Sequence, residues 1–254
     1  MSKQVDALDM EPLDDNAQDR GLKLIVNTST DTGLHPHDVF ISKVVKRLSQ
    51  WTQPDWLDVG CGWHFDWPWE LEREKALLCA ANVVGLDSDR QAIARHRTIR
   101  NRTVGTIERL PFASRSFDIV TASVVLEHLK YPALAFAEIF RVLKCGGCFI
   151  FRTPSARSYF VRVARWLPQN LKVWLATGII QTRNPEDVYP AHYRVNTSET
   201  IQEICKIVGF RRIEITVTKF RGILGKVPAL ARVERIGASV LGMTEGNLVV
   251  EALK

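Results

Sequence analysis

The chain has 254 residues, of which 46% are hydrophobic and 24% are charged, and its formal net charge is +6. This composition excludes a fibrous or wholly disordered protein, and the length is sufficient for one globular domain with a sizeable core. Apolar stretches such as residues 173–180 fall well short of the roughly 18 uncharged residues that a membrane-spanning helix requires. The start of the chain lacks the residue order of a secretion signal, so we expect a cytoplasmic protein.

Residues 1–22 are polar, acidic and aperiodic, and we expect them to form a disordered tail. Six acidic and two basic side chains give residues 1–20 a net charge of −4, which leaves +10 for residues 21–254. A basic body attracts anionic acceptors or surfaces, although scattered Lys and Arg are also typical of any solvated surface. No basic cluster interleaved with aromatic residues occurs, so nucleic acid is not an expected partner.

Residues 23–254 are expected to form a single α/β domain. Apolar residues at helical spacing predict a first helix over 37–50, and from residue 56 onward strands and helices alternate. Strands are predicted near 56–60, 82–87, 103–106, 117–123 and 147–153, and helices near 69–80, 89–101 and 132–143. Strands separated by helical stretches of roughly 10 to 15 residues are typical of βαβ units, and they predict a doubly wound, mostly parallel sheet.

Residues 154–195 interrupt this alternation and are predicted to be a helical cap inserted for substrate binding. Their segment 156–180 combines aromatic and apolar residues with Arg and Lys. Two interpretations remain open for that segment: a lid packed on the sheet, or a peripheral membrane contact. Beyond the cap, the sequence predicts a helix at 197–208 with Thr197 or Ser198 as its N-cap, a strand at 212–217, a helical region at 227–241 and a closing strand at 246–253.

The five cysteines are an odd number, so reduced thiols are expected. Cys145 and Cys148 form a C-x-x-C pair, but neither a second pair nor a nearby His completes a tetrahedral site. No metal is therefore expected.

The segment Asp58-Val59-Gly60-Cys61-Gly62 ends the first strand of the alternating region, and Asp87 ends the next strand. Glycines at a strand end let backbone N–H groups approach a ligand, and an acid on the neighbouring strand can accept hydrogen bonds from ribose hydroxyls. A ligand with ribose and adenine is predicted. The dinucleotide fingerprint G-x-G-x-x-G is incomplete because Phe65 takes the place of its third glycine. An NAD(P)-linked oxidoreductase and a non-catalytic binding module remain as alternatives.

At this point the chain resembles the class I S-adenosylmethionine-dependent methyltransferases, in particular the type 11 group that includes small-molecule and quinone methylases. Four ordered segments carry the resemblance: 57–62, 84–87, 110–120 and 125–147. The resemblance is close over 55–155 and loose over 192–218. It implies a Rossmann-like seven-stranded sheet with an antiparallel C-terminal strand, S-adenosyl-L-methionine as cofactor, and a small-molecule or lipid-like acceptor.

The resemblance also assigns cofactor-binding residues. It places the turn from Gly60 to Gly62 under the methionine part, Asp87 at the ribose and Ile107 with Glu108 beside the adenine. The full predicted set of cofactor-binding residues is Asp58, Gly60, Cys61, Gly62, Asp87, Ile107, Glu108 and Ser123. The chain departs from the family at His64, Thr106 and Cys145, where a Gly, an Asp and a Pro are frequent.

Methyl transfer from a sulfonium is an in-line displacement, so the protein mainly has to align the two reactants. A hydroxyl acceptor would need a base, and the candidate catalytic residues are His128, His192 and Tyr193. Glu127 and His128 could equally be a helix-start pair with a capping role. His192 or Tyr193 is predicted to reach the mouth of the pocket. The sequence leaves the acceptor and the oligomeric state open.

Overall fold

A computed structural model describes residues 23–25, 34–63, 81–159, 161–162, 189–219 and 242–254, together with 232, 236–237 and 239–240. The described residues form one eight-stranded sheet with the strand order β1-β7-β8-β6-β5-β2-β3-β4. The strands are β1 Lys23–Ile25, β2 Asp55–Val59, β3 Asn82–Asp87, β4 Asn101–Val104, β5 Phe117–Ser123, β6 Leu143–Pro154, β7 Arg212–Lys219 and β8 Glu245–Leu253. Among these described strands only β8 pairs antiparallel, with β6 and with β7, so the predicted mostly parallel sheet and its antiparallel C-terminal strand are confirmed.

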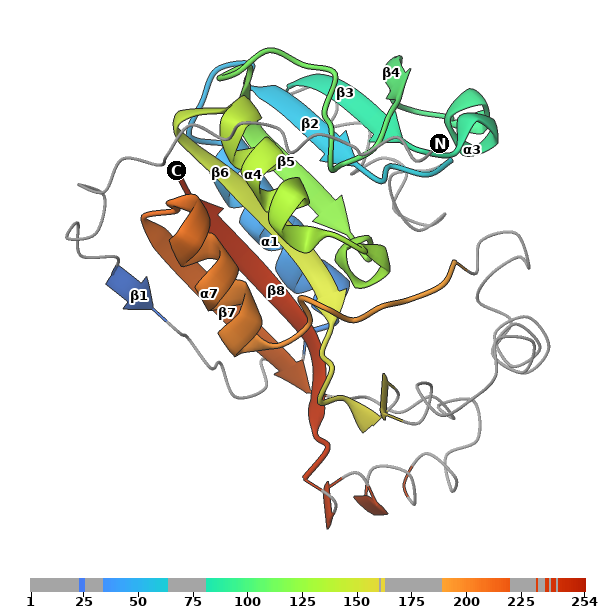
Figure 1. Cartoon of the computed structure of the whole chain (residues 1–254), viewed down its shortest axis with the longest axis vertical. Helices are drawn as coiled ribbons and strands as arrows, with labels where there is room; N and C mark the ends of the chain where they lie inside the picture. Colours follow the sequence, from blue (N-terminus) through green and yellow to red (C-terminus); the bar gives the residue numbers. More distant parts are fainter. Residues whose placement is uncertain are drawn as a thin grey trace, which may run out of the picture.

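Helices cover both faces of this sheet (Figure 1). Helix α1, Pro36–Leu48, packs on the face formed by β6 and β8, whereas α4, Pro132–Val142, and α7, Ser198–Val208, lie side by side on the other face. Helix α3, Arg90–Arg95, packs beside β3 and β4 near one end of the sheet. Within the described ranges, every helix is too short or too polar to cross a bilayer.

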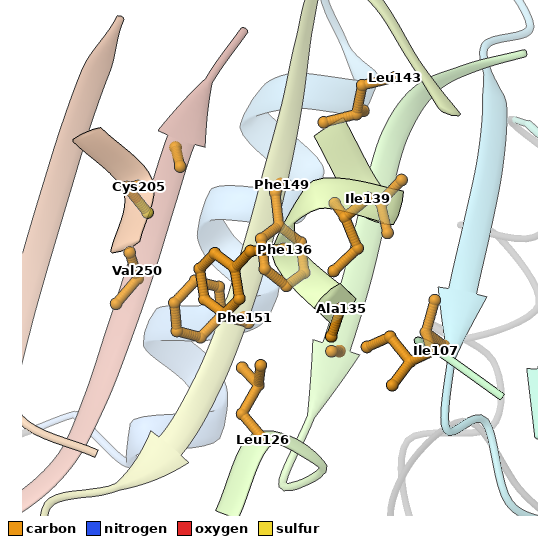
Figure 2. Close-up of a cluster of buried hydrophobic side chains, with 14 of the residues drawn as sticks. Ile107, Leu126, Ala135, Phe136, Ile139, Leu143, Phe149, Phe151, Cys205 and Val250 are labelled. Atoms are coloured by element: carbon orange, nitrogen blue, oxygen red, sulfur yellow. The ribbon is translucent and has the colours of Figure 1, made fainter. Parts of the chain in front are cut away.

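The main core lies between the sheet and the α4 and α7 layer (Figure 2). Phe136 of α4 packs edge-on against Phe149 and Phe151 of β6, with ring centroids 5.6 and 5.7 Å apart. All three side chains are fully buried. Each such aromatic side chain stabilises the fold by about 1.5–3 kcal/mol through the apolar surface it removes from water, so this cluster fixes the middle of the sheet.

The helices and strands that the sequence predicts within the described residues are confirmed in kind, with several shifts in extent. Helix α3 ends at residue 95, six residues before the predicted end, because the buried His96 side chain accepts hydrogen bonds from the Thr98 and Ile99 N–H groups and turns the chain. Strand β4 accordingly starts at Asn101, two residues earlier than predicted. The short strand β1 was not predicted. It adds to the sheet edge beside β7.

Some predictions fall outside the described residues. These are the disordered tail at 1–22, the helix at 69–80, most of the cap at 154–195 and most of the helical region at 227–241. Where α7 begins, the structure selects between the two predicted caps: the Thr197 hydroxyl accepts a hydrogen bond from the Thr200 N–H and closes a reciprocal capping box.

Candidate functional site

The glycine turn after β2 is the first component of the site. The N–H groups of Gly60 and Cys61 donate to the Leu86 carbonyl at 2.7 and 3.2 Å, which ties the turn to β3. Gly60 and Gly62 both have left-handed backbones, with φ of 68° and 60°. A Cβ at Gly60 would collide with the side chain of Val125, so the turn after β5 lies directly against it. Glycine is therefore favoured at position 60 by both the dihedral angles and the close approach, and at position 62 by the dihedral angles alone.

Asp87 is the second component, and the structure brings it next to the glycine turn. Its Oδ2 accepts a hydrogen bond from the Gly62 N–H at 2.8 Å, and its Oδ1 accepts one from the Asp89 N–H at 2.8 Å. Each carboxylate oxygen has two acceptor positions, so both oxygens of Asp87 keep capacity for donors of a ligand. Parallel pairing of β2 with β3 produces this arrangement, because both strands end at the same sheet edge.

Asp58 and Cys61 lie deeper in the structure than the turn that they flank. Asp58 is 5% exposed, and its Oδ1 accepts a hydrogen bond from the Thr121 hydroxyl at 2.6 Å. Burial raises the pKa of the Cys61 thiol, and the nearby charges of Asp58 and Asp87 raise it further. Cys61 is consequently a protonated packing residue, and its Sγ occupies space 2.9 Å from where a Cβ on Gly85 would stand.

The predicted adenine residues follow β4. The Gly105 N–H donates to the Asp87 carbonyl at 2.9 Å, so this loop runs beside the ribose carboxylate predicted above. Ile107 is buried in the main core cluster and Glu108 is half-buried. Ser123, at the end of β5, is also half-buried, and its hydroxyl accepts a hydrogen bond from Arg152 Nε at 2.8 Å. The predicted role of these three residues in cofactor binding stays a prediction.

The three candidate catalytic residues come together at the 3-10 turn η2, Leu126–His128. The N–H groups of His192 and Tyr193 both donate to the Glu127 carbonyl, at 2.7 and 3.0 Å. His128 Nδ1 lies 2.8 Å from the Pro190 carbonyl oxygen. His192 is exposed, Tyr193 is partly buried, and Tyr193 has a left-handed backbone with φ of 50°. The structure therefore joins two segments that lie more than sixty positions apart in the sequence.

We call residues 189–196 the strap. It runs past the η2 turn and leads into α7, and it is the orange trace at the start of that helix in Figure 1. At its far end the Tyr189 hydroxyl donates to Asp89 Oδ2 at 3.0 Å, and closer to α7 the Arg194 Nη1 donates to the Lys130 carbonyl at 2.9 Å. The strap thus connects the end of β3 with the turn after β5.

The sequence did not reveal a buried chain of hydrogen bonds that supports the contact between the strap and the η2 turn. Asn196 Nδ2 donates to Thr153 Oγ1 at 2.6 Å, and Thr153 in turn donates to Glu127 Oε2 at 3.1 Å. All three side chains are at most 3% exposed. No local pattern marks them, because the three residues come from separate elements. The N-cap of α3 at Asp89 could have been found from the sequence, since an Asp directly before a helix is a typical N-cap.

Within the described residues, no three His, Cys, Asp or Glu side chains gather as a metal site would require. The site instead suits an uncharged, hydroxyl-bearing ligand part, because the glycine turn carries little side-chain bulk and the Asp87 carboxylate keeps acceptor capacity.

Comparison with known proteins agrees with this geometry. The family model described as a methyltransferase domain matches residues 57–151. A probable S-adenosylmethionine-dependent methyltransferase of Mycolicibacterium smegmatis is 27% identical over 189 residues, which cover 73% of this chain and 62% of the relative. A malonyl-[acyl-carrier protein] O-methyltransferase of Herminiimonas arsenicoxydans is 38% identical over 109 residues, covering 40% of this chain and 38% of that protein. The chain thus spans less than two thirds of the length of these curated relatives.

Among solved structures, phosphoethanolamine N-methyltransferase 2 of Haemonchus contortus, in complex with S-adenosyl-L-methionine, has a TM-score of 0.52 at 18% identity. The match covers 84% of this chain and 52% of that one, and it shows a shared fold. The matched residues 57–151 include the glycine turn, Asp87 and the η2 turn. The match of residues 57–151 to the methyltransferase domain, these relatives and this sheet order support a class I S-adenosylmethionine-dependent methyltransferase of the type 11 group.

Proposed function

We propose that this chain transfers the methyl group of S-adenosyl-L-methionine to a small-molecule or lipid-like acceptor, at an oxygen or a nitrogen atom. The observation that carries the proposal is the hydrogen bond of 2.8 Å between the Gly62 N–H and Asp87 Oδ2. It joins a turn with two left-handed glycines to a carboxylate with remaining acceptor positions, at the carboxyl edge of a parallel sheet where nucleotides bind.

In this proposal, Asp87 accepts hydrogen bonds from the ribose hydroxyls and the turn from Gly60 to Gly62 lies under the methionine part. Asp58 contributes negative charge beneath the turn, toward the methionine ammonium group. Ile107 and Glu108 flank the adenine, and Ser123 lies toward the sulfonium. When bound, the cofactor supplies a methyl group already activated by the positive charge on sulfur. The protein therefore mainly has to align the methyl group with the acceptor atom. Such alignment can account for about 7–11 kcal/mol of the activation barrier.

His128 is the proposed base for a hydroxyl acceptor. A carbonyl oxygen can only accept, so the contact of 2.8 Å with the Pro190 carbonyl places the imidazole proton on Nδ1. Nε2 then carries the lone pair that can take a proton, a contribution of about 10²- to 10⁴-fold. The carboxylate Oε1 of Glu127 lies 3.9 Å from Nε2. His192 and Tyr193 are proposed to line the acceptor side, and an amine acceptor would need no base.

The class of acceptor is supported by the chemistry of similar proteins, which is diverse. The Herminiimonas relative is named for an O-methylation of a carrier-bound malonyl group, and the Haemonchus structure for an N-methylation of phosphoethanolamine. Both acceptors are small groups with an anionic part, and the net charge of +10 in residues 21–254 suits such groups. A reaction in the cytoplasm, and delivery of a lipid-like acceptor through membrane contact of residues 156–180, belong to the same proposal.

The first experiment measures ligand-induced stabilisation. Purified protein is melted alone, with S-adenosylhomocysteine and with NADH, at equal ligand concentrations. We expect only S-adenosylhomocysteine to raise the Tm, because a ligand that binds the folded state stabilises it by mass action. Stabilisation by NADH alone would support the oxidoreductase alternative. The acceptor is then found by incubating the protein with methyl-labelled cofactor and a fractionated extract, and by identifying the product that gains the label.

A further inference from the structure

Tyr189 bridges the two halves of the proposed site. Its hydroxyl donates to Asp89 Oδ2 at 3.0 Å, and its ring packs edge-on against His128 with centroids 6.0 Å apart and an interplanar angle of 73°. Asp89 follows β3 and His128 follows β5, and β2 separates these two strands in the sheet. One side chain of the strap thus touches both the cofactor side and the acceptor side.

On the cofactor side, the bridge leads directly to the proposed ribose carboxylate. The Asp89 N–H donates to Asp87 Oδ1 at 2.8 Å, and Asp87 Oδ2 accepts the Gly62 N–H. Asp89 Oδ1 caps α3 by accepting from the N–H groups of Gln91 and Ala92, at 2.7 and 3.2 Å. The two backbone N–H groups lower the pKa of the Asp89 carboxyl most, and the Tyr189 hydroxyl lowers it further, so Asp89 is a carboxylate at neutral pH.

On the acceptor side, the bridge fixes His128 from two directions. The Tyr189 ring lies against the imidazole, and the carbonyl of the next residue, Pro190, holds Nδ1 at 2.8 Å. The ring of Pro190 restricts φ, which limits the conformations open to the backbone at this position. The strap N–H groups of His192 and Tyr193 are anchored on Glu127, directly before His128. A displacement of Tyr189 would therefore be transmitted to the imidazole.

We propose that Tyr189 is a positioning residue: by joining Asp89 to His128, it couples occupancy of the ribose site to the placement of the imidazole. This inference rests on the proposed function and deepens it. A ligand held by Asp87 orders the segment from Asp87 to Asp89, which strengthens the bond from Tyr189 and fixes the strap over His128. By linkage the coupling is reciprocal, so a strap fixed at Tyr189 also binds the adenosyl ligand more tightly.

The test uses the variant Tyr189→Phe, which keeps the ring against His128 and removes only the hydroxyl. Tyr131→Phe is the matched control, because that tyrosine is 53% exposed and adjoins the same η2 turn at the start of α4. Amide hydrogen exchange of residues 189–196 is measured with and without S-adenosylhomocysteine, and the affinity for that ligand is measured by calorimetry. In the wild type and in Tyr131→Phe we expect the ligand to slow strap exchange. In Tyr189→Phe this protection and the affinity should each fall about threefold to tenfold, as suits one partly exposed bond to a carboxylate.

A second variant, Asp89→Ser, keeps a side-chain oxygen that caps α3 but removes the reach to Tyr189. We expect the double variant to resemble either single variant, because both changes remove the same bond. The ¹⁵N resonances of the His128 ring, assigned by their loss in His128→Gln, should shift in Tyr189→Phe from the Nδ1-protonated form toward a mixture of tautomers.

The two proposals fail in distinguishable ways. If the wild type does not bind S-adenosylhomocysteine, the proposed function fails. If the wild type binds it but Tyr189→Phe shows the same strap protection, the same affinity and the same His128 resonances, the coupling through Tyr189 is overturned while the proposed function stands.

Discussion

At the scale of single residues, the two glycines of the turn after β2 have different physical constraints. Both have positive φ, but a Cβ at Gly60 would collide with Val125 whereas one at Gly62 meets no atom within 4 Å. Gly62→Ala should therefore lower the free energy of unfolding by only about 1–2 kcal/mol from backbone strain. Gly60→Ala adds overpacking and should lower it by about 2–5 kcal/mol. Urea unfolding of both variants checks this order, and equal losses would show that the Val125 contact does not matter.

Asp87 supports a prediction about binding. Asp87→Asn keeps the size of the side chain but replaces a charged acceptor by an amide with one carbonyl oxygen. The affinity for S-adenosylhomocysteine should fall at least tenfold, since a hydrogen bond to a charged group contributes about 1.5–3 kcal/mol. Asp118→Asn is the control, because Asp118 pairs with Lys144 at 2.8 Å at the start of β5, away from the site. Calorimetry should show unchanged affinity in this control, and a similar loss in both variants would contradict the assignment of Asp87.

At the scale of elements, α4 holds the loop that follows the predicted adenine residues. Glu138 Oε2 accepts from the Leu110 N–H at 2.8 Å, and Arg141 donates to the carbonyls of Leu110 and Phe112 at 3.0 and 2.8 Å. The hydrogen bond from the Arg141 side chain lowers the pKa of the Glu138 carboxyl, and the hydrogen bond from the Leu110 N–H lowers it by a smaller amount. The charged pair of Glu138 and Arg141 thus holds the backbone of the loop against helix α4.

This pair predicts a pH dependence of stability. A depressed carboxyl pKa contributes stability that is present above the unfolded-state pKa of about 4.3 and is lost as the pH falls through the folded-state pKa. Glu138→Gln should lower the free energy of unfolding by about 0.5–1 kcal/mol at pH 7, a modest figure because the pair is partly exposed. The gap to wild type should narrow as the pH falls below the unfolded-state pKa of the carboxyl. Denaturation at several pH values measures it, with the exposed Glu203→Gln as control, and a gap that persists at low pH would contradict the prediction.

The elements also show where sequence patterns are sufficient and where they are not. Strands β3 and β5 coincide with their predicted ranges, because runs of Val, Ile and Leu between helical stretches leave little alternative in a buried parallel sheet. Helix α3 was predicted too long. Its end depends on the His96 ring, which caps the following turn once it is buried, and burial is a tertiary property.

At the scale of the whole molecule, strand β8 connects the β1-β7 edge of the sheet to the remaining strands. Strand β8 lies between β6 and β7 and pairs with both along its length. Glu251 of β8 is 7% exposed and is paired with Arg47 and Lys43 of α1, which fixes the helix layer to this strand. Cohesion of the sheet therefore depends on the final residues of the chain.

Deletion of residues 245–254 should abolish cooperative unfolding, because β6 and β7 would lose their shared partner and expose two strand edges. Deletion of residues 1–22, predicted from the sequence to be a disordered tail, is the control and should leave the Tm unchanged. Circular dichroism melting distinguishes the two. A shortened chain that still melts in one transition at the wild-type temperature would contradict the prediction for β8.

The sequence by itself determined the fold class and the order of the described elements from α1 onward, and it predicted the two ends of the candidate cofactor site, Gly60 with Gly62 and Asp87. These follow from local patterns: period, strand ends and glycines at fixed spacing. Only the tertiary structure decided that residues 189–196 cross the site from Asp89 to Glu127, and that Thr153 and Asn196 support Glu127. Contacts between residues 26 to 100 positions apart leave no periodic mark in a single sequence, because they depend on where the packed sheet brings separate loops together.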